Sequence, residues 1–223
     1  MLPLNARHPP LPATPVAAIV RGVTRLVIVD DHAAVRAGVA SLLASEPDLT
    51  VEATVATAAE AEAECRHHQP HVLVADYHLP DLDGLSLCLR LDTRDGPPVV
   101  LYSAFADEHL GVLAIVAGAR AMVGKSADPI ELVAAVRAVA DHARPLNAPG
   151  PAALQAAGAQ LDPDDLPVLG MLTAGVEPSE IARTLGIRED WLAARRWAML
   201  KRLRASPLRR PAAMPTHPGI PAA

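Results

Sequence analysis

The sequence contains few aromatic residues, few cysteines and no long apolar run, and each shortage excludes a class of protein. Phe, Trp and Tyr make up 2% of the 223 residues, so the core must consist of Val, Leu, Ile and Ala. The two cysteines, Cys65 and Cys88, are too few for a disulfide scaffold or a cysteine-based zinc module. No apolar run approaches the ~18 residues of a membrane span, and prolines leave no room for a signal-peptide core. We therefore expect a soluble cytoplasmic protein.

Charge is divided unevenly along the chain, although the net charge is only −5. Residues 25–145 carry nine basic and 18 acidic side chains, whereas residues 161–210 carry nine basic and seven acidic ones. Six of those last nine basic residues lie between Arg188 and Arg204. An acidic half followed by a half with a basic stripe indicates two domains with separate tasks.

Proline-rich and uncharged segments mark the domain boundaries. Residues 1–23 and 207–223 are rich in proline without apolar periodicity, which predicts disorder at both ends. Residues 145–160 carry no charge and three prolines, and they are typical of an interdomain linker. The two domains are therefore expected at residues 24–144 and 161–206.

Short apolar runs alternate with helical patterns in the first domain. Strands are expected at 26–30, 49–55, 71–76, 98–103 and 119–123. Helices are expected at 33–43, 58–68, 85–91, 108–116 and 129–141. Five β–α units predict an α/β fold, a doubly wound five-stranded parallel sheet covered on both faces. Ligands of such sheets bind at the carboxyl ends of the strands.

Polar side chains occupy those strand ends. Asp30 and Asp31 follow the first strand, Asp76 ends the third, Ser103 ends the fourth and Lys125 follows the fifth. One aspartate at a strand end is usually a turn or helix cap, but five such positions together predict one crevice. Packed carboxylates repel unless a cation neutralises them, and oxygen ligands with water select Mg²⁺ over zinc. The lysine and the hydroxyl would suit a phosphoryl group carried by Asp76.

The histidines and cysteines of this half suggest no zinc site. Cys65 and Cys88 fall in helical segments and are expected as small core residues. The histidine spacing fits no zinc ligand pattern, which predicts surface or loop positions for His32, His67, His68, His71 and His78.

Residues 25–144 resemble the receiver domain of two-component response regulators. The resemblance rests on VIVDDH, ADYHLPDLDG (75–84), LYSA (101–104) and GARAMVGK (118–125), and it extends to the subfamily with a LuxR-type helix-turn-helix output. It implies that Asp76 accepts phosphate from a histidine kinase. It also implies that Asp31, Asp76 and the main-chain carbonyl of His78 ligate Mg²⁺, with Asp30 acting through water.

The resemblance further gives roles to residues of the last two strands. Ser103 would be the switch hydroxyl, and Lys125 the lysine that contacts the phosphoryl group. Met122 stands where the family commonly has an aromatic residue that swings inward on phosphorylation. A thioether fills less volume and adapts to several packings, so we expect a weaker switch.

Three helices are expected in the second domain. The first begins at Asp162 as N-cap and ends at Gly175, and the second runs from residue 179 to Gly186. The third, 189–204, would turn four apolar residues to the core, namely Leu192, Met199, Leu200 and Leu203. That would leave five basic residues largely free, namely Arg195, Arg196, Lys201, Arg202 and Arg204.

Residues 161–203 resemble the LuxR-type helix-turn-helix, with EIA at 180–182 and LGI at 185–187. The resemblance implies that the third helix enters the DNA major groove, with Arg195 or Arg196 contacting bases and the later basic residues contacting phosphates. The sequence departs from the family at Pro167, which would distort the first helix, and in lacking a fourth helix. Pairing of two copies would then fall to the receivers.

Two interpretations remain open. The first is a transcriptional regulator switched by phosphorylation of Asp76, with no enzymatic activity beyond its own phosphorylation and dephosphorylation. The alternative is a phosphorylatable receiver that acts as a protein-interaction module, with a degenerate helix-turn-helix that does not contact DNA.

Overall fold

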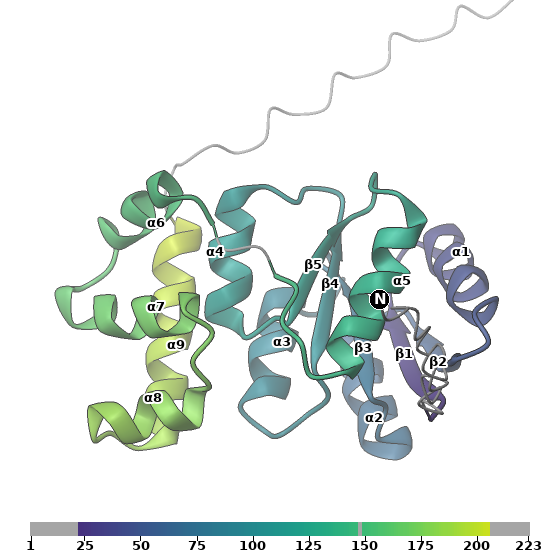
Figure 1. Cartoon of the computed structure of the whole chain (residues 1–223), viewed down its shortest axis with the longest axis horizontal. Helices are drawn as coiled ribbons and strands as arrows, with labels where there is room; N and C mark the ends of the chain where they lie inside the picture. Colours follow the sequence, from purple (N-terminus) through teal and green to yellow (C-terminus); the bar gives the residue numbers. More distant parts are fainter. Residues whose placement is uncertain (1–21, 147–148, 206–223) are drawn as a thin grey trace, which may run out of the picture.

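A computed structural model describes residues 22–146 and 149–205, and it contains a parallel sheet followed by a set of helices (Figure 1). The strands lie in the order β2-β1-β3-β4-β5, and every neighbouring pair is parallel. Their bounds are β1 Thr24–Val29, β2 Leu49–Val55, β3 Val72–Asp76, β4 Val99–Ser103 and β5 Ala121–Gly124. The predicted doubly wound sheet is confirmed.

Helices cover both faces of the sheet. Their bounds are α1 Ala33–Ala44, α2 Ala58–His68, α3 Gly84–Asp92, α4 Glu108–Ala117 and α5 Pro129–Ala140. The alternating side chains of the strands divide the core, so that α2, α3 and α4 pack on one face and α1 and α5 on the other. Cys65 and Cys88 are buried in the first of these two layers, as predicted.

The second part of the chain is helical. Its elements are α6 Pro151–Gly158, a 3-10 turn at Pro163–Asp165, α7 Leu166–Thr173, α8 Pro178–Leu185 and α9 Glu189–Ala205. Gly175 and Gly186 have positive φ values of 77° and 64°, which suits the left-handed ends of α7 and α8. The four predicted core residues of the last helix are buried.

Three local features differ from the sequence expectations. The predicted linker 145–160 contains α6, because Pro151 stands in the first helical turn, where no backbone donor is needed, and an alanine-rich stretch follows. Pro167 does not interrupt a helix, because α7 begins at Leu166 and the preceding turn is a 3-10 turn. Asp162 makes no side-chain capping bond.

The helical part packs directly on the receiver-like part. Helix α4 contacts α6, α7 and α9, and α9 runs beside α4 in Figure 1. One apolar cluster continues from Leu101 in the sheet through Val116 in α4 to Leu192 in α9. No helix within 22–146 or 149–205 is both long and apolar enough to cross a membrane. The predicted disorder at 1–23 and 207–223 lies outside the described residues, apart from residues 22 and 23.

Candidate functional site

Four of the predicted strand-end residues meet at one edge of the sheet. Asp30 and Asp76 are buried and lie at the ends of the adjacent strands β1 and β3, while Asp31 beside them is exposed. Lys125 enters from the end of β5, with its Nζ 2.7 Å from Oδ2 of Asp30 and 2.9 Å from Oδ2 of Asp76. The expected crevice is therefore present, and its lysine already bridges two carboxylates.

The ammonium group of Lys125 is held in its charged form. Burial alone would lower the pKa of this lysine, but the hydrogen bonds that it donates to Asp30 and Asp76 and the charges of both carboxylates outweigh burial. The pKa is consequently raised above its ordinary value. A fixed positive charge beside Asp76 suits an incoming phosphoryl group.

Ser103 lies at the end of β4 but does not contact Asp76 in this state. Its hydroxyl donates to the carbonyl of Phe105 at 3.0 Å and accepts the Phe105 N–H at 3.2 Å. The Lys125 N–H donates to the Ser103 carbonyl at 2.7 Å, which joins the ends of β4 and β5. The hydroxyl must turn away from its own loop before it can contact a group on Asp76.

The loop after Asp76 is anchored at both ends. A Cβ on Gly84 would lie 2.2 Å from the Asp76 carbonyl oxygen, so only glycine fits there. Asp83 accepts the Ser86 N–H at 3.0 Å and caps α3, and Asp81 accepts the N–H groups of the first two residues of α2. The loop is therefore tied to two helices.

The donor set fits a divalent cation. One donor atom from each of four residues lies within 4.8 Å of the others, and the residues are Asp30, Asp31, His32 and Asp76. Three carboxylates against one lysine leave negative charge that a cation would neutralise, and carboxylate oxygens are ligands that Mg²⁺ accepts. His32 is exposed as predicted, but its place in this set was not foreseen. Its position directly after two aspartates was the available signal.

Comparisons with known proteins agree with this geometry. The response regulator receiver domain family matches residues 26–137. The transcriptional regulatory protein UhpA of Salmonella typhimurium is 34% identical over 183 residues, covering 81% of this chain and 92% of that protein. The DNA-binding transcriptional activator DevR/DosR of Mycobacterium tuberculosis is 34% identical over 177 residues, covering 74% of this chain and 81% of that protein. The chain belongs to the response regulator family.

A solved structure supports the same placement. The crystal structure of a LuxR-family two-component response regulator from Aurantimonas sp. SI85-9A1 matches with a TM-score of 0.53 and 32% identity. The match covers 55% of this response regulator and 89% of that chain. The strand-end aspartates and Lys125 thus lie in a receiver domain.

The basic face of α9 differs from the expectation that its five basic residues are largely free. Arg196 is 1% exposed, donates through Nη1 to Oδ2 of Asp92 at 2.6 Å and through Nε to the Val116 carbonyl at 2.9 Å. Arg204 donates to both carboxylate oxygens of Asp83, at 2.5 and 3.0 Å. The prediction that these two arginines are free was wrong. Helix α9 lies on the receiver, where Asp92 of α3 pairs with Arg196 and Asp83, the N-cap of α3, pairs with Arg204.

The other basic residues of α9 face the output domain or solvent. Arg195 pairs with the buried Asp165 and stacks over the ring of Trp191, 4.7 Å from its centroid. Arg202 pairs with Asp162. Lys201 is exposed and makes no ion pair with any described residue. Of the proposed DNA contacts, Lys201 is thus the one most open to a polyanion in this state.

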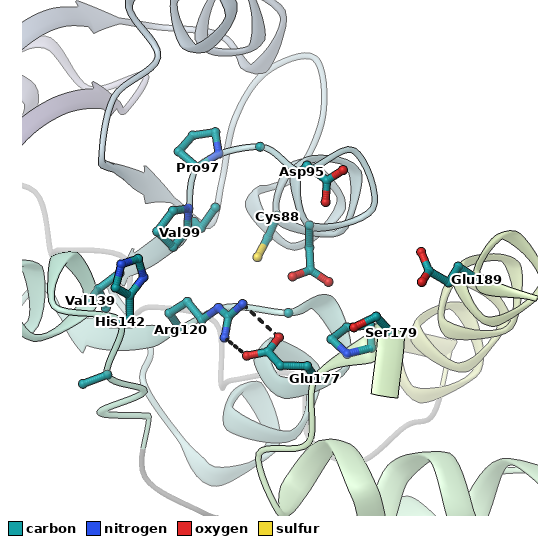
Figure 2. Close-up of a pocket in the computed structure, with 16 residues that line it drawn as sticks. Cys88, Asp95, Pro97, Val99, Arg120, Val139, His142, Glu177, Ser179 and Glu189 are labelled. Atoms are coloured by element: carbon teal, nitrogen blue, oxygen red, sulfur yellow. Dashed lines mark hydrogen bonds and ion pairs between the residues drawn. The ribbon is translucent and has the colours of Figure 1, made fainter. Parts of the chain in front are cut away.

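A second ion-pair cluster joins the domains at the opposite end of the sheet. Glu177 pairs with Arg120 at 2.7 Å, as Figure 2 shows. It also pairs with Arg144 at 2.6 Å. Burial would raise the pKa of Glu177, but hydrogen bonds and charges from the two arginines outweigh it and lower the pKa. The two domains are thus held together by charged contacts in this response regulator.

Proposed function

We propose that this response regulator is phosphorylated on Asp76 by a histidine kinase and regulates transcription by binding DNA through α9. The observation that carries the proposal is the bridge from Lys125 to Asp30 and Asp76 at the carboxyl edge of the sheet. We place the protein in the cytoplasm, where such a kinase would present its phosphohistidine, and assign it no other enzymatic activity.

The receiver residues support phosphoryl transfer. An Asp76 carboxylate oxygen would form a bond to phosphorus as the bond to the kinase histidine nitrogen breaks. Lys125 stands 2.9 Å from Asp76 and would stay with the phosphoryl oxygens, while Ser103 would turn from Phe105 toward them. Mg²⁺, when bound, supplies the remaining positive charge. We assign Asp31, Asp76 and the His78 carbonyl as its ligands, with Asp30 acting through water.

The contacts of α9 support the proposal that its basic face is covered before phosphorylation. A helix that enters the major groove needs its basic face open, yet Arg196 and Arg204 are bound to Asp92 and Asp83. DNA binding through these residues therefore requires α9 to leave α4. Asp83, the N-cap of α3, lies at the end of the Asp76 loop and binds Arg204, which links the proposed phosphorylation site to α9.

We assign five α9 residues to DNA. Arg195 and Arg196 are the proposed base contacts, and Lys201, Arg202 and Arg204 are the proposed phosphate contacts. The prolines of residues 207–223 argue against a fourth output helix in the sequence, so we propose pairing of two copies through the receivers.

The alternative of a protein-interaction module is favoured by one observation: the carboxylates of this same chain already occupy Arg195, Arg196 and Arg204. The two functions differ in their response to salt. DNA binding by the phosphorylated protein should weaken steeply between about 50 and 200 mM salt. Absence of binding at low salt would support the interaction module.

Replacing the phosphoacceptor tests the receiver assignment. Asp76→Asn should abolish labelling by a small phosphodonor such as acetyl phosphate in the presence of Mg²⁺, because an amide oxygen is a poor nucleophile. Phosphate incorporation is measured directly by intact mass. Asp81→Asn serves as the control, since Asp81 caps α2 and makes no contact with Lys125. Undiminished labelling of Asp76→Asn would overturn the assignment.

A further inference from the structure

His32 occupies a position where its side chain has no structural task in its own helix. It is the N-cap residue of α1, but its side chain makes no capping hydrogen bond. Its backbone N–H instead donates to Oδ1 of Asp30 at 2.8 Å. The imidazole is left beside the carboxylates, with Nδ1 2.6 Å from Oδ1 of Asp31 and 3.7 Å from Oδ1 of Asp30.

This arrangement puts a nitrogen donor next to the oxygen donors of the proposed cation site. The four donor atoms of Asp30, Asp31, His32 and Asp76 all lie within 4.8 Å of one another. Ligands of a six-coordinate ion at ~2.1 Å are separated by about 3.0 to 4.2 Å, so a small adjustment would bring His32 onto the same cation as Asp31 and Asp76, with Asp30 still acting through water. The imidazole side chain is 67% exposed and can rotate without disturbing the core.

Nitrogen and oxygen donors prefer different metals. Mg²⁺ is a hard cation that takes oxygen ligands and water, whereas imidazole suits later first-row cations, whose affinity rises from Mn²⁺ to Ni²⁺. We propose that His32 is a ligand that gives this acidic site a preference for transition cations such as Co²⁺ and Ni²⁺ over Mg²⁺. The proposal rests on the acidic cation site assigned under the proposed function.

Metal titration of the full chain tests the proposal. Co²⁺ and Mg²⁺ are each titrated into the wild type and into His32→Asn by calorimetry. Asparagine is a good N-cap, so the variant keeps the start of α1. We expect His32→Asn to lose about tenfold or more in Co²⁺ affinity while Mg²⁺ affinity stays unchanged. The matched control is His67→Asn. His67 is an exposed histidine at the end of α2, so this variant should keep both its Co²⁺ affinity and its Mg²⁺ affinity.

A spectroscopic measurement separates ligation from an indirect effect. Electron spin echo spectra of the Mn²⁺-loaded protein should show coupling to a histidine nitrogen, which changes on ¹⁵N-histidine labelling and disappears in His32→Asn. Unchanged Co²⁺ affinity in that variant, an equal loss for Mg²⁺, or absence of the nitrogen coupling would each overturn the proposal.

Phosphate labelling keeps this inference distinct from the proposed function. If the wild type is labelled on Asp76 with Mg²⁺ and the nitrogen coupling is absent, the role of His32 alone is wrong. If the wild type is not labelled at all, the phosphoacceptor assignment is wrong, whatever the metals show.

Discussion

Two clusters in this response regulator combine basic and acidic side chains, but they differ in charge balance. At the carboxyl edge of the sheet, Lys125 faces Asp30 and Asp76, with Asp31 exposed nearby. Under α9, Arg196 faces Asp92 and the carbonyl of Val116. The first cluster has three carboxylates to one lysine, whereas the second is balanced one to one.

That difference in balance separates a ligand site from a structural contact. The excess carboxylates at the sheet edge repel one another until a cation neutralises part of their charge. The Arg196 pair is almost fully buried, with its arginine side chain 1% and its aspartate side chain 11% exposed. The two charges neutralise each other, although the buried Nη2 of Arg196 has no hydrogen-bond partner among the described residues. We therefore assign the response to a cation and to phosphorylation to the first cluster, and a structural contact between the two parts of the chain to the second.

The largest expected effect comes from breaking the balanced pair. Arg196→Met should lower the free energy of unfolding by about 3–5 kcal/mol, because Asp92 is then left buried without a counter-charge. Urea unfolding measures it, and the double variant Arg196→Met with Asp92→Leu should recover most of the loss. Lys201→Ala, on the exposed side of α9, should change stability by no more than about 0.5 kcal/mol. Equal small losses for both single variants would show that the pair does not hold the domains.

The effect of phosphorylation on the free energy of DNA binding should be smaller than the loss of stability in Arg196→Met. Met122 is half-buried against the α4 layer and replaces the ring that would move inward. We expect DNA affinity to rise less than about a hundredfold on phosphorylation, which corresponds to a coupling below about 2.7 kcal/mol. Fluorescence anisotropy with a DNA duplex, before and after treatment with a phosphodonor, gives the ratio. A larger rise would show that the switch does not depend on an aromatic at this position.

The sheet-edge cluster was predictable from sequence because of a rule of topology. Parallel strands end at one edge, so residues as distant as Asp30 and Lys125 had to meet once the strands were recognised. Nothing comparable fixes where two domains touch. The position of the contact between the domains depends on how α9 packs on α4 and on the acidic residues Asp83 and Asp92 beside it.

The burial of Arg196 shows what sequence reasoning missed. Residues 192, 196, 199 and 203 are spaced four, three and four apart, so the arginine shares the apolar face of α9. Its charge suggested solvent exposure, but the partner Asp92 is 104 residues away in the chain. Helix α6 was missed for a similar reason, because Ala157 is buried only through contact with other helices.

A moderate effect is expected at the contact nearest the phosphorylation loop. Asp83→Asn keeps the N-cap of α3 but removes the charge that binds Arg204. Because this pair is partly exposed, its loss should favour the open form by no more than about 1 kcal/mol, or about fivefold in unphosphorylated DNA affinity. The matched control is Asp128→Asn at the N-cap of α5, which does not contact α9. An equal response in both variants would argue against the path through Arg204.

The smallest effect on stability is expected from the ion pairs of Glu177 with Arg120 and Arg144, and this effect should depend on pH. Arg120 and Arg144 lower the pKa of Glu177 below its ordinary value of 4.5, outweighing the effect of burial. The folded protein therefore favours the carboxylate, so the stabilisation is complete above the ordinary value and is lost as pH falls through the lowered pKa.

Stability measured across this pH range tests the contribution of Glu177. The side chain is 49% exposed, so solvent screening keeps the effect small. Glu177→Gln should be slightly less stable than the wild type at neutral pH, and the difference in unfolding free energy should shrink as pH falls below 4.5. Glu180→Gln, at an exposed position in the first turn of α8, should show no such convergence. A difference that grows toward low pH would have the wrong sign for a carboxylate held by arginines, and the cluster could not then contribute to domain closure.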